Sequence, residues 1–263
     1  MLARMPTGEC RRDLDFPRRA TLLLLAVLAV SRPTPAAAQS SGISIGWQDC
    51  RTRPGAGGTT QTFGCTNTIN DFPLFPALRL ASPIDSVIAM ELVIDVDVAT
   101  DPLPVWWHME PGTACHSNAW VASTSTSGNC ADAWQGSGVA SVQGWLVGTP
   151  GNSTRHGRLL VAASVLPDAF VTLDADVGYT VCRVAIGRNA SASTCDGCTT
   201  PACLVFNSVL IRRLPGSSFE EVLLVTPETA SANMVVWQGG VGADCLSVPT
   251  RRTTWGSVKA LYH

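Results

Sequence analysis

Lysine and charged residues in general are scarce in this chain. Only 14% of its 263 residues are charged, and Lys259 is the one lysine beside seventeen arginines. Nucleic acids and anionic membranes bind chains in which cations are numerous and clustered. The composition therefore argues against nucleic acid as a partner.

Several catalytic motifs are also missing. The chain has no Gly-x-Ser-x-Gly elbow, no His-Glu-x-x-His motif, no Walker loop and no dinucleotide fingerprint. Haem attachment needs Cys-x-x-Cys-His, but Gly112 stands where the first cysteine would precede Cys115 and His116. With four histidines in all, there is little material for a histidine-based triad. We therefore expect no cofactor and favour a protein that is not an enzyme.

Residues 1–38 have the three parts of a secretory signal peptide. A basic region precedes the apolar stretch 20–30, and Ala36-Ala37-Ala38 fits the small-residue cleavage rule. The apolar stretch is much shorter than the roughly 20 residues of a membrane-spanning helix, so cleavage is favoured over a signal anchor. The remaining chain, 39–263, has twelve basic and seventeen acidic residues, a formal charge of −5. We expect it to be secreted or at the cell surface (extracellular or periplasmic), with no membrane span, and the arginine, alanine and glycine bias is typical of a bacterial genome rich in GC.

Alternation of apolar and polar residues predicts strands along most of the exported part. The clearest example is Val87–Val98, where every second residue is apolar, which indicates a strand with one buried and one wet face. Turn-forming residues separate the candidates. The other expected strands are Ile43–Trp47, Gln61–Cys65, Phe75–Leu80, Val139–Val147, Arg158–Val165, Tyr179–Ile186, Cys203–Arg212, Glu221–Thr226 and Asn233–Gln238.

About ten short strands with tight turns and almost no helical period predict an all-β protein. We expect a single-domain antiparallel β-sandwich over residues 39–263, with a jelly roll as one variant, held by disulfides. The exception is a short C-terminal helix, capped by Thr254, in which four apolar side chains share one face and pack on the sheet edge: Trp255, Val258, Leu261 and Tyr262.

Nine of the ten cysteines follow the signal peptide, and an exported chain meets conditions in which disulfides form. Because nine is odd, we expect four disulfides and one free thiol. The spacings favour Cys50–Cys65 and Cys115–Cys130, each closing a loop of about fifteen residues. Cys182 alternates inward and is the candidate free thiol. Two further disulfides of open pairing would use the remaining four: Cys195, Cys198, Cys203 and Cys245.

The same four cysteines allow a second interpretation. Zinc takes four thiolate ligands, and Cys195-x-x-Cys198 has knuckle spacing. A redox pair needs a helix N-terminus in a thioredoxin-like setting, whereas this motif lies in a Gly/Thr/Pro loop. We favour structural disulfides and no metal, and keep a metal or redox protein as an alternative.

Aromatic and acidic clusters offer weaker candidates. The cluster Trp106-Trp107-His108-Met109-Glu110 with Cys115-His116 offers His, Met and Cys side chains that copper takes as ligands, but an aromatic core anchor is favoured. Trp120 and Trp134 lie in Ser/Gly/Asn-rich stretches and are candidate contacts to a sugar ring. Asp95 and Asp97 share a face of one strand, as the carboxyls of a glycan-active hydrolase could, although a solvated sheet face is the favoured interpretation.

Two runs resemble a group of uncharacterised secreted proteins of environmental bacteria. They are the Cys-x-Gly-Cys-x-x-Pro-x-Cys-Leu-Val-Phe-Asn-Ser run from Cys195 to Ser208 and the Trp-Gly-x-Val-Lys-x-Leu-Tyr ending from Trp255 to Tyr262. The resemblance implies a secreted origin and carries no known activity.

These observations favour a secreted, non-catalytic binding or structural protein of the bacterial exterior, with a glycan or a surface protein as partner. The alternatives are an extracellular carboxylate-based hydrolase and the metal or redox protein on the Cys195–Cys203 cluster. The ligand and the oligomeric state stay open.

Overall fold

The computed structural model describes residues 41–51, 58–65, 71–113, 115–124, 130–166, 169–187 and 195–246. The predicted signal peptide and the predicted C-terminal helix lie outside these ranges. The described strands all fall in one compact unit.

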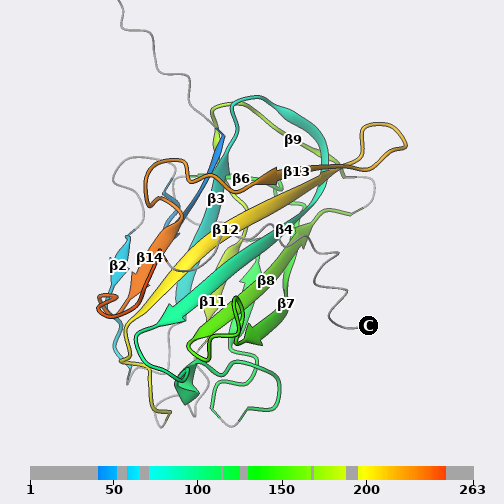
Figure 1. Ribbon diagram of the computed structural model, residues 1–263. Helices are drawn as coiled ribbons and strands as arrows, with labels where there is room; N and C mark the ends of the chain where they lie inside the picture. The colour runs from blue at the N-terminus through cyan, green and yellow to red at the C-terminus, as the bar shows by residue number, and fades with distance from the viewer. Residues whose placement is uncertain are drawn as a thin grey trace, which may run out of the picture. The chain divides into compact units, whose positions relative to one another are not determined.

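Two β-sheets make up the described fold (Figure 1). Six strands form the first sheet: β1 (Gly42–Trp47), β3 (Phe72–Arg79), β5 (Trp120–Ser123), β6 (Ala131–Asp132), β10 (Gly178–Thr180) and β11 (Arg183–Ile186). Eight form the second: β2 (Thr60–Gln61), β4 (Ile84–Val98), β7 (Val139–Val147), β8 (His156–Ser164), β9 (Val171–Leu173), β12 (Ala202–Arg213), β13 (Glu220–Leu224) and β14 (Met234–Trp237).

The predicted all-β sandwich is confirmed. Most pairs are antiparallel, and two short pairs, β10 with β6 and β14 with β2, are parallel. The described helical structure is one 3-10 turn, η1 (Val105–Trp107). The sequence prediction missed η1 and the short strands β5, β6 and β9, because two to four residues are too few to show a period.

The core lies between the two sheets and follows the predicted alternation. In β4, Met90, Leu92, Ile94 and Val96 are all buried in one hydrophobic cluster with residues of the first sheet. β4 is central, since β12 pairs along one side of it and β8 along the other. Its inward face therefore supplies the longest continuous apolar row of the second sheet.

Strand β1 closes one side of the sandwich. It pairs with β3 of the first sheet, and the backbone of Ile43 also bonds to Thr226 and Glu228, which precede β14 of the second sheet. A Cβ on Gly42 would lie 2.5 Å from the Glu228 Cα, so only glycine allows this approach. All six residues of β1 are consequently buried.

The structure has four disulfides: Cys50–Cys130, Cys65–Cys198, Cys115–Cys195 and Cys203–Cys245. The predicted pairs Cys50–Cys65 and Cys115–Cys130 are wrong. Cys50 follows a strand of the first sheet and Cys65 a strand of the second, while β5 and β6, which follow Cys115 and Cys130, lie at opposite edges of the first sheet. Proximity in sequence therefore does not bring these cysteines together.

Candidate functional site

One end of the sandwich is an aromatic cluster tied by two disulfides. Trp237 of β14 lies 5.0 Å from Trp106 and 4.6 Å from Phe72, measured between ring centroids. Its indole Nε1 donates to the carbonyl of Cys198 at 2.7 Å, which is itself bonded to Cys65. The Trp106-Trp107 pair is fully packed in this cluster, as expected for a core anchor.

The cysteines of the zinc alternative do not converge. Cys195 is bonded to Cys115, Cys198 to Cys65, and Cys203 to Cys245, so three separate disulfides consume them. Thiolates are needed for zinc, and disulfide sulfur does not supply them. Within the described residues, no group of three or more His, Cys, Asp or Glu side chains could hold a metal ion.

Cys182 is a buried free thiol in the described part of the chain. It lies between β10 and β11, and burial raises its pKa to about 12. Because the thiolate is the reactive form, this cysteine is chemically inert in the folded protein.

His116 is buried against the ring of Trp106, with ring centroids 4.4 Å apart. Burial lowers its pKa to about 4, since the imidazolium would lose its hydration there. Neither ring nitrogen has a hydrogen-bond partner among the described residues. The side chain is therefore a neutral member of the aromatic cluster.

Asp95 lies on the outer face of the second sheet, yet it is fully buried. Arg158 on the neighbouring strand donates to both carboxylate oxygens at 2.6 and 2.7 Å, and Asn207 donates to Oδ2. Asn207 is the extra residue of a bulge in β12, which turns its amide to the outer face. Desolvation raises the pKa of Asp95, against the opposing effect of Arg158.

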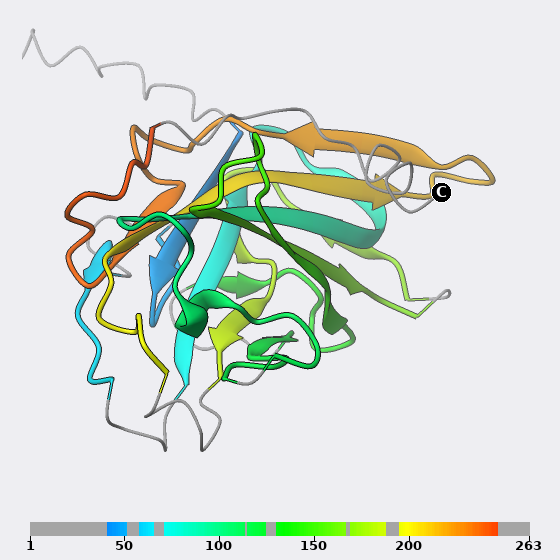
Figure 2. The same ribbon diagram turned by 60° about the horizontal axis from the view of Figure 1, so that its bottom comes forward.

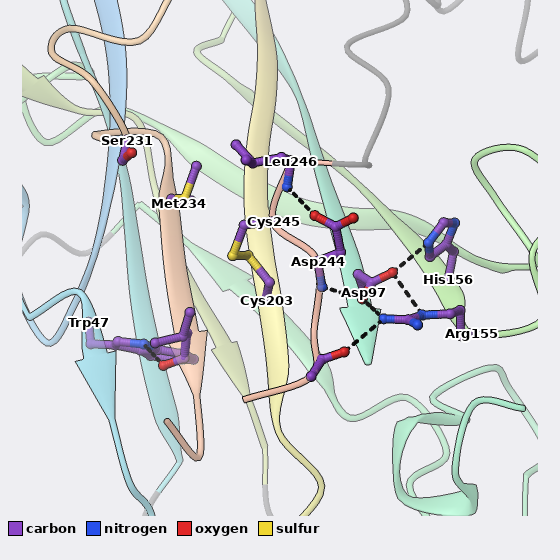
Figure 3. The surroundings of a disulfide bond; sticks show 12 residues. Trp47, Asp97, Arg155, His156, Cys203, Ser231, Met234, Asp244, Cys245 and Leu246 are labelled. Carbon is purple, nitrogen blue, oxygen red and sulfur yellow. Dashed lines mark hydrogen bonds and ion pairs between the residues drawn. A yellow bond between two sulfur atoms is a disulfide. The ribbon is translucent and has the colours of Figure 1, made fainter. Parts of the chain in front are cut away.

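Asp97, two residues further on the same face, accepts four hydrogen bonds from three residues (Figure 3). Arg155 donates to both carboxylate oxygens, His156 Nε2 lies 2.6 Å from Oδ2, and the backbone N–H of Asp244 donates at 2.9 Å. Nδ1 of His156 faces the carbonyl of Pro150 at 3.0 Å. Both ring nitrogens are thus engaged, and neither is left to act as a general base.

The expectation of a solvated acidic face is therefore wrong for Asp95 and Asp97. The period of two correctly placed them opposite the core, but it could not show that arginines of neighbouring segments bind them there. Each carboxylate is held by a cation, so the two do not form the acid and base or nucleophile pair of a glycosidase. The arrangement fits ion pairs that hold strands and loops together.

The two tryptophans predicted as ligand contacts are also buried. Trp134 donates from Nε1 to the carbonyl of Val181 at 2.6 Å, and Gly138 lies so close to its ring that a Cβ there would clash. Trp120 packs against Trp145 with ring centroids 5.5 Å apart. Neither presents a ring face to a sugar, so this prediction is corrected.

Large apolar side chains are exposed at the other end of the second sheet. Leu166 and Phe170, in the β8–β9 connection, are 70% and 48% exposed, and Phe219, before β13, is 70% exposed. A backbone bond from Ala169 to Leu166 folds the first loop into a turn. Figures 1 and 2 show the β12–β13 turn projecting from this end.

Strand register places the two phenylalanines at the same end of the second sheet. Val171, Val87, Arg213 and Glu220 form one row across β9, β4, β12 and β13. Phe170 and Phe219 each precede the row's outermost residue by one position. Three strand spacings separate the ends of the row, about 15 Å. We call Leu166, Phe170 and Phe219 the apolar loop set. This set was not identified from the sequence, because large apolar residues usually lie in the core.

Ion pairs border the apolar loop set. Arg213 lies between Asp85 at 2.7 Å and Glu220 at 2.6 Å. One strand position further, Arg212 lies between Glu91 and Glu221. Beside Phe219, the carboxylates of Asp85 and Glu220, whose side chains are 66% and 50% exposed, thus share the Arg213 guanidinium.

No protein-family model matches the chain, and the comparison with curated proteins finds no match. Among solved structures, a cohesin module from Clostridium perfringens ATCC13124 family 33 glycoside hydrolase is similar, with 9% identity and a TM-score of 0.31. The similarity covers 72% of this chain and 98% of that chain. A TM-score this low carries no argument about function. In the described ranges, no helix is long and apolar enough to cross a membrane.

Proposed function

We propose that this chain is a secreted, non-catalytic module that binds a protein at the bacterial exterior. The observation that carries the proposal is the apolar loop set. Burying Leu166, Phe170 and Phe219 would stabilise the fold, yet they stand in water on two loops joined to a rigid sheet. Loops held by a rigid scaffold are where binding residues concentrate, and exposed aromatic side chains are frequent interface anchors.

Export is supported by the disulfides. Four of them join segments 42 to 133 residues apart in the sequence, and such bonds persist in oxidising compartments. The signal peptide predicted over residues 1–38 agrees with this compartment. The disulfides and the predicted signal peptide therefore both support a location outside the cytoplasm.

A protein is a better partner than a glycan. Sugar rings stack on exposed Trp or Tyr, but all seven tryptophans in the described ranges are buried, and so is Tyr179. The exposed carboxylates of Asp85 and Glu220, which share Arg213, complement an apolar surface edged by Lys or Arg. The proposed partner is thus a surface protein with an apolar site and a basic rim.

Binding of the purified chain, starting at Gln39, to intact producing cells tests the proposal. We expect Phe170→Ser with Phe219→Ser to weaken binding at least about tenfold, the effect of losing an interface anchor. Val241→Ser is the matched control, because Val241 is 80% exposed in the loop after β14, away from these residues. Protease treatment of the cells should abolish binding, and periodate oxidation of glycans should not.

Three results would contradict the proposal. Cells that retain none of the protein would exclude a surface partner, and equal binding by the double variant would exclude the apolar loop set. Loss of binding after periodate alone would identify a glycan instead.

A further inference from the structure

Part of the outer face of the second sheet is buried, although this face of a two-layer sandwich should be exposed to solvent. Leu160 of β8 and Leu210 of β12 project away from the core, yet they are only 6% and 8% exposed. Each described strand belongs to one of the two sheets, so no described strand forms a third layer. An antiparallel sheet with one solvated face normally shows exposed polar residues at such positions.

The buried ion pair on this face also indicates that a further segment covers it. Asp95 and Arg158 lie in the row that contains Val205, and both are almost fully buried. A charge pair taken out of water costs free energy unless its partners are held in place. Arg158 and Asn207 close over Asp95, but the Arg158 side chain is itself only 4% exposed, so a covering segment best accounts for the burial of the pair.

One edge of the face is already covered by the end of the described chain. The segment 243–246 crosses it, bonded through Cys245 to Cys203 and through the Asp244 N–H to Asp97 (Figure 3). The side chains of Ala243 and Cys245 cluster with Val205 and Met234. The chain is thus fixed on the outer face where residue 247 begins.

Residues 247–263 are long enough, and apolar enough on one side, to cover the rest of the outer face. Along β12, Cys203 and Leu210 are seven residues apart, a distance of about 23 Å in a strand. Residues 247–253 alone can span about that distance when extended. The predicted helix after them carries Trp255, Val258, Leu261 and Tyr262 on one face.

The charges of residues 247–263 also complement those of the outer face. Arg251 and Arg252 lie in the connecting stretch, and the outer face beyond Asp95 carries Glu91 and Glu221 around Arg212. Opposite charges at the rim of a contact fix its register more than its strength.

We propose that residues 247–263 dock on the outer face of the second sheet and cover Leu160 and Leu210. The Cys203–Cys245 disulfide and the Asp97 contacts fix the start of this segment, and the apolar face of its predicted helix packs on the sheet. The cover is intramolecular and does not depend on the proposed partner, because the apolar loop set lies at the far end of β4.

Hydroxyl-radical footprinting of the purified chain from Gln39, read by mass spectrometry, tests the cover. In the unchanged protein we expect little labelling of Leu160 and Leu210. Val258→Asp places a charge in the proposed contact and should raise their labelling several-fold. Ala260→Asp, on the opposite side of the predicted helix, is the matched control and should leave it unchanged.

Leu92 and Ile94 of the inner face serve as internal references, since they stay protected while the sandwich is folded. A chain ending at Leu246 should show the same increase as Val258→Asp. Unchanged labelling in Val258→Asp with the references protected would overturn the proposal. Protection that rises with protein concentration and survives the truncation would assign the face to a second copy of the chain and would also overturn it.

Discussion

At one end of the second sheet, Trp106 and Trp237 pack against two disulfides, whereas at the other end Phe170 and Phe219 face solvent. Both ends belong to the same long strands, β4 and β12, so strand pairing supports them equally. The difference lies in what closes each end: loops cross-linked over aromatic rings on one side, and short turns on the other.

This contrast separates residues that stabilise the fold from residues that are free to bind. Aromatic side chains in a cross-linked core contribute several kcal/mol each through burial and packing. Exposed side chains on turns contribute little to stability, and a protein can place binding groups there at small cost. Three predictions test the contrast, from the largest expected effect to the smallest.

Removing the central ring of the aromatic end should have the largest effect. Trp237→Ala deletes contacts to Trp47, Phe63, Phe72 and Trp106 and leaves a cavity. We expect the free energy of unfolding to fall by about 3–5 kcal/mol, measured by urea denaturation with disulfides intact. A loss under about 1 kcal/mol would show that the disulfides hold this end without the ring.

His116 should make the same end sensitive to acid. Its pKa is about 4 in the folded protein against 6.5 as the ordinary value, so the unfolded chain takes up a proton first as the pH falls. Stability from this residue is complete above pH 6.5 and is lost as the pH falls towards 4, by up to about 3 kcal/mol.

His116→Phe keeps a ring against Trp106 and removes the titration. The difference in unfolding free energy between this variant and the unchanged protein should therefore shift in the variant's favour as the pH falls, measured by denaturation at several pH values. A difference that stays constant from pH 7 to 4 would contradict a buried, neutral histidine.

Truncation at the other end should barely change stability. Phe219→Ala removes a side chain that is 70% exposed, so we expect a change within about 0.5 kcal/mol in the same denaturation measurement. A loss comparable to that of Trp237→Ala would mean that Phe219 is packed in solution, and the apolar loop set would no longer be a free surface.

Sequence patterns were most successful where a residue's environment depends on its own strand. The alternation in Val87–Val98 predicted the inward row of β4, and turn residues separated most of the remaining strands. The same local alternation indicated that Cys182 points inward. Strands of two to four residues were not predicted, because they contain too few positions to show a pattern.

Patterns failed where the environment depends on neighbouring strands. Asp95 looked wet because polar residues at alternate positions usually are, but Arg158 on β8 and the bulged Asn207 on β12 close over it. Trp120 and Trp134 lie among polar residues in sequence, and only the packing of Trp145 and Val181 shows that they are buried.

The amino-acid order alone therefore determines a cysteine-rich chain of short strands with one apolar face and predicts its export, since those properties follow from local composition and a period of two. Tertiary structure decides which cysteines pair, which carboxylates meet arginines, and which apolar side chains stay in water. The physical reason is that each depends on strand order and register, which set distances between residues far apart in the chain. Cys50 and Cys130 illustrate this, since 80 positions separate them in sequence and one disulfide joins them in the fold.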